Sequence, residues 1–62
     1  MSIGENLKRL RKKKGLTQEV LSEMVGISRP LYTQIERGTR TLNLPLAKEI
    51  AEILGCSVED FY

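Results

Sequence analysis

The sequence of 62 residues has no histidine and a single cysteine, Cys56. These shortages exclude a zinc site built from cysteine and histidine, as well as a disulfide within the chain. Catalysis is not expected either, because the cysteine has no candidate base, no glycine-rich phosphate loop is present, and the carboxylates are scattered. We therefore expect neither an enzyme nor a cofactor, and Cys56 is best explained as a small packing residue in a reducing cytosol.

Long apolar runs are also missing from the sequence. No segment approaches the roughly 18 apolar residues of a membrane span, and the N-terminus has no apolar run of a signal peptide. The sequence therefore predicts a cytoplasmic protein that has no membrane contact. Its length fits one domain, residues 1–62, with a small and mainly aliphatic core, because only 5% of the residues are aromatic.

Charge is distributed unevenly along the chain. Residues 1–41 contain nine lysines and arginines and four glutamates, a net charge of +5, whereas residues 42–62 carry −3. Six of the basic residues lie between positions 8 and 14. A basic helix is by itself usually a solvated surface, but this asymmetry favours a polyanion partner on one side of the molecule.

The most informative stretch is residues 17–38, which we interpret as two short helices around a tight turn. Thr17 and Ser28 are good N-cap residues, and Gly26 and Gly38 are suited to ending a helix. Two helices joined by a turn with glycine are typical of a helix-turn-helix, whose second helix enters the DNA major groove. The same spacing also occurs in small helical bundles, so spacing alone leaves both interpretations open.

The residues of this stretch run Thr-Gln-Glu-x-Leu-x-x-x-Val-Gly-Ile-Ser-Arg-x-x-x-x-x-Ile-Glu-Arg-Gly. This pattern resembles the phage-repressor type of helix-turn-helix protein, the Cro/CI or XRE family, and the resemblance covers Leu7 to about Phe61. It implies an all-α, compact, five-helix lambda-repressor-like fold with the helix-turn-helix at helices 2 and 3. It further implies a sequence-specific transcriptional regulator of double-stranded DNA, a repressor acting as a homodimer on an inverted repeat, of bacterial, phage or mobile-element origin.

Apolar spacing and capping residues predict the other helices. The first is expected over residues 3–13, the fourth over 44–54, and a last short helix begins after Ser57. In the second helix, the residues expected to face the core are Leu21, Met24 and Val25.

The exposed side of the second helix of the motif offers candidates for reading bases. Arg29 can give paired donors to guanine, and Gln34 can give a donor and an acceptor to adenine. Thr33 offers a hydroxyl or a methyl group, whereas Pro30 offers only shape and an apolar contact. Tyr32, on the opposite side, is expected to be buried, where its hydroxyl needs a partner.

A second group of residues is expected to contact the DNA backbone. By the resemblance, Gln18 holds a phosphate at a helix N-terminus, and Glu36 pairs with Arg11, which it orients toward another phosphate. Helix N-termini are themselves anion sites. The full set of expected backbone contacts is Arg11, Gln18, Ser28, Arg37 and Arg40.

The surface for a second copy is the least defined part of the prediction. The candidates are the apolar residues Leu42, Leu44, Phe61 and Tyr62. Phe61 is equally explained as core and Tyr62 as a frayed terminus, and these alternatives stay open. A different class of function is also open: the same fold serves antitoxin-like or anti-repressor modules that bind a regulatory protein partner.

Overall fold

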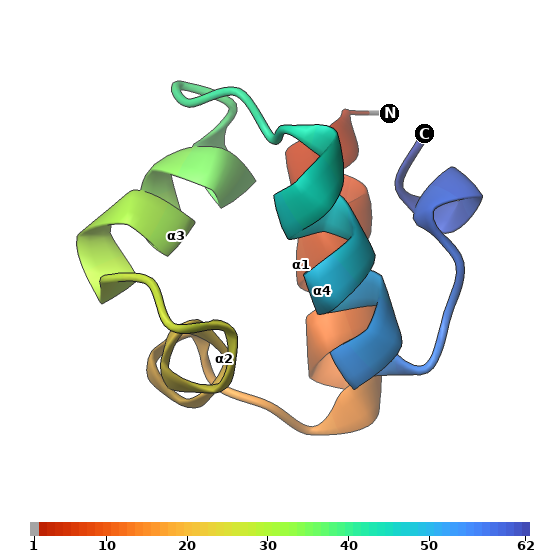
Figure 1. Cartoon of the computed structure of the whole chain (residues 1–62), viewed down its shortest axis with the longest axis horizontal. Helices are drawn as coiled ribbons and strands as arrows, with labels where there is room; N and C mark the ends of the chain where they lie inside the picture. Colours follow the sequence, from red (N-terminus) through yellow and green to blue (C-terminus); the bar gives the residue numbers. More distant parts are fainter. Residues whose placement is uncertain (1) are drawn as a thin grey trace.

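A computed structural model describes residues 2–62, so Met1, the first residue of the predicted domain, lies outside the described part. The elements are, in order, α1 (Ile3–Lys14), α2 (Gln18–Val25), α3 (Arg29–Arg37), α4 (Leu44–Leu54) and the short 3-10 helix η1 (Val58–Phe61) (Figure 1). The predicted all-α class is confirmed. The expected fifth helix is a single turn of 3-10 helix, Val58–Phe61, instead of an α-helix.

Side-chain caps explain where the α-helices begin. At the start of each one, a serine, threonine or asparagine oxygen accepts a hydrogen bond from a backbone N–H of the first turn. Gly26 ends α2 with a φ of 87°, a conformation that costs glycine little. Its left-handed backbone allows α3 to begin only three residues later, which makes the tight turn of the predicted helix-turn-helix.

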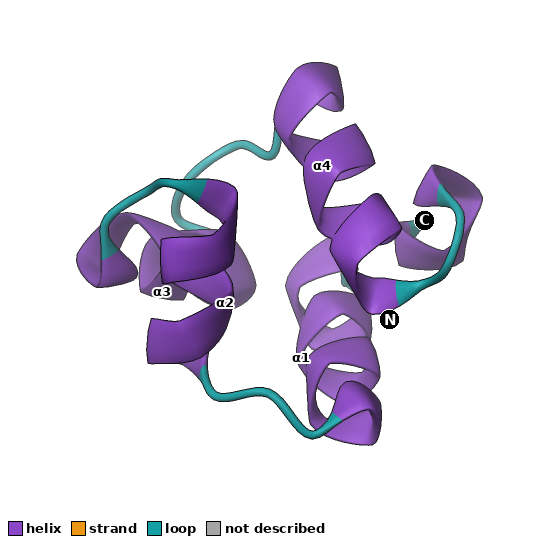
Figure 2. Ribbon diagram, turned by 60° about the horizontal axis from the view of Figure 1, so that its bottom comes forward, coloured by secondary structure: helices purple, strands orange, loops and turns teal. Residues whose placement is uncertain are grey.

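Helix α1 is the centre of the packing. It contacts α3 on one side and α4 and η1 on the other, while α2 packs against α3 and α4 (Figures 1 and 2). One cluster of buried side chains fills the space between the helices, and it includes Leu7, Leu21, Tyr32, Ile50 and Phe61. All five elements therefore contribute to a single core.

Two predicted orientations are wrong. Met24 was expected to face the core, but 56% of its surface is exposed. The buried side of α2 lies between Leu21 and Ser22, and Met24 is about 110° away from it around an axis with 3.6 residues per turn. Leu42 was a candidate for the dimer surface, but it is buried within the chain. For Phe61, where the sequence left both a dimer contact and a core position open, the structure shows a core position.

Two close contacts of α1 were not predicted from the sequence. Gly4 packs directly against the backbone carbonyl of Glu36 at the end of α3. The buried side chain of Asn6 donates a hydrogen bond from Nδ2 to the carbonyl oxygen of Phe61, at 2.9 Å. The first contact sets the distance between α1 and α3, and the second fastens the last turn of the chain to α1.

Candidate nucleic-acid interface

The outer side of α3 carries the residues predicted to read bases. Tyr32 and Ile35 point into the core, which leaves the opposite side of α3 free of packing. Arg29, Pro30 and Gln34 are exposed. A shallow hollow on this side is lined by Arg29, Pro30, Thr33, Gln34 and Arg37. Four of these were the predicted base contacts, and the fifth, Arg37, lies one turn further along.

A second hollow adjoins the first one at the N-terminus of α2. It is lined by Arg11, Leu16, Thr17, Gln18, Glu19 and Arg29. Because Arg29 lines both hollows, the outer side of α3 and the start of α2 form one continuous surface. Thr17 caps α2 by accepting a hydrogen bond from the N–H of Val20 at 3.1 Å. The unpaired backbone N–H groups of such a helix start favour an anion.

A network of hydrogen bonds between partly buried side chains lies beneath this surface and connects its helices. Arg11 Nε lies 2.7 Å from Glu36 Oε2, and Arg11 Nη1 donates to the carbonyl oxygen of Leu16 at 2.7 Å. Gln18 Nε2 donates to Glu36 Oε1 at 2.9 Å, and Thr33 Oγ1 donates to Gln18 Oε1 at 3.0 Å. The network therefore connects α1, α2 and α3 through four side chains.

The charges of the network stabilise each other. Burial alone raises the pKa of Glu36, but hydrogen bonds from Arg11 and Gln18 outweigh it, and the net pKa is lowered. The hydrogen bond to Glu36 raises the pKa of Arg11. Burial, followed by the nearby Glu36 carboxylate, raises the pKa of Tyr32. Tyr32 is buried as expected, but its hydroxyl has no hydrogen-bond partner within residues 2–62.

The network changes what three predicted residues can do. The side chain of Arg11 is only 8% exposed, and its guanidinium donates hydrogen bonds to Glu36 and Leu16, which leaves few of its donors for a direct phosphate contact. Gln18 and Thr33 are partly buried, and both ends of the Gln18 amide are already hydrogen bonded. The remaining N–H of Gln18 is the group left for a phosphate.

The other predicted backbone contacts are exposed. Ser28 accepts a hydrogen bond from the N–H of Leu31 at 3.2 Å, so its side chain caps α3. Arg37 lies in the last turn of α3, and Arg40 lies in the loop between α3 and α4. Both arginines are exposed, and neither is in an ion pair with another residue of the segment 2–62.

The described residues hold neither a cluster of metal ligands nor a helix that could cross a membrane. In residues 2–62, no group of three or more histidine, cysteine, aspartate or glutamate side chains is arranged to hold a metal ion. Over the same residues, no helix has the length and apolar character that crossing a membrane requires.

Comparison with known proteins assigns the family. The model of a helix-turn-helix family matches residues 7–61. The chain belongs to the XRE type of helix-turn-helix proteins. Members of this family are DNA-binding transcriptional regulators and are not enzymes. The family resemblance that was based on residues 17–38 is thereby confirmed. The match covers residues 7–61, as the sequence predicted.

Several XRE-type relatives are similar over most of this chain. An HTH-type transcriptional regulator of Bacillus subtilis, YqaE, is 42% identical over 57 residues, which are 92% of this chain and 49% of YqaE. The regulator y4dJ of Sinorhizobium fredii is 40% identical over 55 residues, which are 89% of this chain and 71% of y4dJ. The chain thus spans about half of one curated relative and about seven tenths of the other.

A solved structure agrees with the helical arrangement. The restriction-modification controller protein C.AhdI from Aeromonas hydrophila superposes with a TM-score of 0.90 and is 32% identical in sequence. The match covers 97% of this chain and 87% of the controller protein. The XRE-type helix-turn-helix therefore accounts for both the sequence and the packing of the described residues.

Proposed function

We propose that the chain is a cytoplasmic, sequence-specific repressor of transcription that inserts α3 into the major groove of double-stranded DNA. The observation that carries the proposal is the outer side of α3, where Arg29, Pro30 and Gln34 are exposed on one continuous surface with the start of α2. Arg29 and Gln34 have the donor and acceptor groups that distinguish guanine and adenine in the major groove.

The surrounding residues supply the contacts that position α3. Arg37 lines this surface, and Arg40 follows in the loop after α3; both are exposed cations suited to phosphates. The start of α2 offers backbone N–H groups and the remaining N–H of Gln18. Arg11 and Thr33 act indirectly. The hydrogen bond of Arg11 to Glu36 connects α1 with α3, and that of Thr33 to Gln18 connects α3 with α2.

The small size of the domain supports the proposal of a homodimer on an inverted repeat. A single module of this kind buries about 600–1,000 Å² on DNA, which is modest for a specific complex. Two copies would place their α3 helices one DNA turn, about 34–36 Å, apart. Of the four residues predicted for the dimer surface, Leu44 and Tyr62 are exposed, and we assign the contact to them.

Selection of binding sites from a random pool of DNA duplexes, at two salt concentrations, tests the proposal. The expected result is an inverted repeat whose half-site centres are about one helical turn, ~34–36 Å, apart. Recovery of no sequence motif, with weak retention that disappears in salt, would contradict it. The antitoxin-like or anti-repressor alternative, in which the chain binds a regulatory protein, would then explain the fold better.

A further inference from the structure

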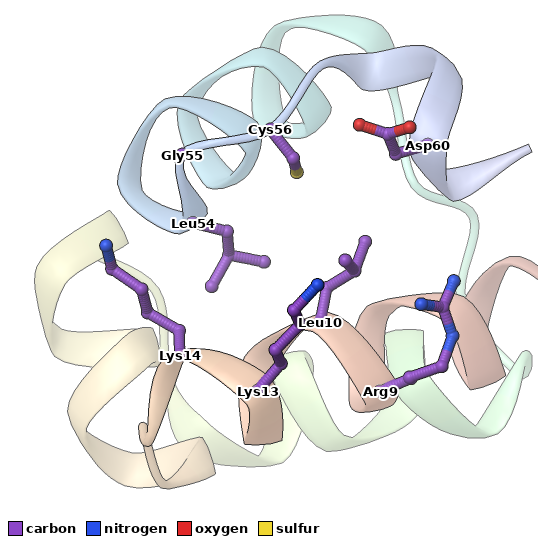
Figure 3. A pocket seen from close by; sticks show the side chains of 8 residues that line it. All are labelled: Arg9, Leu10, Lys13, Lys14, Leu54, Gly55, Cys56 and Asp60. Carbon is purple, nitrogen blue, oxygen red and sulfur yellow. The ribbon is translucent and has the colours of Figure 1, made fainter.

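A basic groove lies between α1, the end of α4 and η1. Its lining residues are Arg9, Leu10, Lys13, Lys14, Leu54, Gly55, Cys56 and Asp60. In Figure 3, the three cations extend from α1 toward the loop that follows α4, with Leu10, Leu54 and the Cys56 sulfur between them. This groove is on the side of α1 that contacts α4 and η1, so it is separate from the outer side of α3 (Figure 1).

The cations of the basic groove are not neutralised within the chain. The single ion pair found in residues 2–62 joins Arg11 and Glu36, which are outside the groove. The only carboxylate in the groove, Asp60, already accepts hydrogen bonds from the backbone and side chain of Ser57, at 3.0 and 3.3 Å. The groove therefore presents a net positive rim around an apolar floor. Burial, followed by Asp60, raises the pKa of Cys56, so its thiol belongs to that neutral floor.

A surface of the opposite character lies between α2 and α4, and we call it the acidic patch. It is a shallow hollow lined by Met24, Val25, Glu49, Glu52 and Ile53. Met24 is exposed here although it is apolar, and its flexible thioether side chain adapts readily to a partner surface. Neither glutamate is in an ion pair with another residue of the described part.

We propose that the basic groove of one copy of this chain binds the acidic patch of a second copy. Glu49 and Glu52 would face Lys13 and Arg9, and Met24 would cover the apolar floor of the groove. Ile53 and Leu54 are consecutive residues of α4, so the two surfaces meet at the end of this helix. A two-fold axis at that end would let each copy use both surfaces at once.

The contact is expected to be weak and sensitive to salt. A standard protein interface buries about 800 Å² on each partner, which is about one fifth of the 4062 Å² that the chain exposes. The two hollows offer less than that, and their attraction is mainly between exposed charges. Such attraction is screened as the Debye length falls from about 10 Å at 0.1 M salt to about 3 Å at 1 M.

Sedimentation equilibrium of the chain without DNA, at 0.1 M and 1 M salt, tests this contact. We expect reversible self-association that weakens at high salt. Lys13→Glu and Glu52→Lys should each raise the dissociation constant about tenfold, since like charges then face each other. An equimolar mixture of the two variants should recover association, because the reversed groove of one variant matches the reversed patch of the other.

Matched controls separate this contact from a general effect of charge. Lys8→Glu and Glu59→Lys make the same charge changes at exposed positions outside both surfaces, and they should leave association unchanged. The proposal is overturned if no self-association occurs, if the controls weaken it equally, or if the mixture does not recover it. Self-association that neither Lys13→Glu nor Glu52→Lys weakens would also overturn the proposal. That result would not affect the separate proposal of a DNA-bound dimer through Leu44 and Tyr62.

Discussion

Gly4 of α1 lies directly against the backbone carbonyl oxygen of Glu36 in α3, and no side-chain atom fits between them. The obstacle is backbone and cannot rotate away as a flexible side chain would. Because Glu36 also receives hydrogen bonds from Arg11 and Gln18, this contact sets the position of the residue on which the network depends.

Replacement of Gly4 by alanine is expected to destabilise the fold. In an exposed helix interior, glycine to alanine would stabilise by roughly 0.5–1 kcal/mol, but here overpacking should cost about 1–3 kcal/mol instead. Urea denaturation measures the difference. Lys8→Ala, at an exposed position of the same helix, serves as the control and should change stability by less than about 0.5 kcal/mol. A Gly4→Ala variant as stable as the parent would show that α1 and α3 can separate freely.

The pH dependence of stability should report on Glu36. Folding lowers the pKa of Glu36, so the unfolded chain binds the proton more readily than the folded chain does. The stability that the ionised carboxylate provides is therefore lost as the pH falls from about 4.3, the pKa of a free glutamate, through the lower pKa of the folded state. Glu36→Gln leaves the Arg11 charge buried without its partner and should cost roughly 3 kcal/mol at pH 7. Denaturation of both proteins between pH 7 and pH 3 should show this difference shrinking in acid. If the difference in stability between the two proteins does not change with pH, the ion pair between Arg11 and Glu36 is not its cause.

Substitutions on α3 should separate base reading from phosphate binding. Arg29→Ala and Gln34→Ala are each expected to cost about 1–3 kcal/mol on the selected DNA site and much less on random DNA. Lys12 is an exposed cation in the last turn of α1. As a phosphate contact, its replacement by alanine should weaken both complexes about equally and reduce the salt slope by about one. Fluorescence anisotropy with the two duplexes measures these losses. Equal losses from all three substitutions would reject the assignment of Arg29 and Gln34 as reading residues.

The proposed dimer predicts a specific effect of Leu44. This residue is the first of α4, and 54% of its surface is exposed. Leu44→Glu should not harm the helix, because a negative charge is favourable in the first turn. It should reduce affinity for the full inverted repeat toward that for a single half-site, as measured by gel shift with both duplexes. If the variant still binds the full inverted repeat more tightly than a single half-site by the same factor as the parent, Leu44 is not part of the dimer contact.

The sequence predicted the features that depend on local chemistry. Caps such as Thr17 and Ser28 act on their own first turn, and Gly26 acts on its own backbone, so the α-helix bounds agree within about one residue. The pairing of Arg11 with Glu36, known in advance only through the family resemblance, is present in the structure.

The features that were missed depend on how the helices are placed relative to one another. Gly4 is an unfavourable helix residue, and this was the one signal that α1 approaches another backbone closely. Asn6 gave no signal, because its partner is a backbone carbonyl 55 positions away. The apolar character of Met24 indicated burial, but the packed side of α2 is decided by Leu21 and Ser22.

The hydrogen bond from Asn6 to the Phe61 carbonyl has a consequence for synthesis of the protein. Helix α1 leaves the ribosome before α3, α4 and η1, yet part of its buried surface is covered by Phe61, a residue made about fifty residues later. The core therefore cannot close during translation until Phe61 has passed the exit tunnel. Before then the part of α1 that packs on η1 remains uncovered, and the repulsion between the basic residues of α1 helps to keep nascent chains apart.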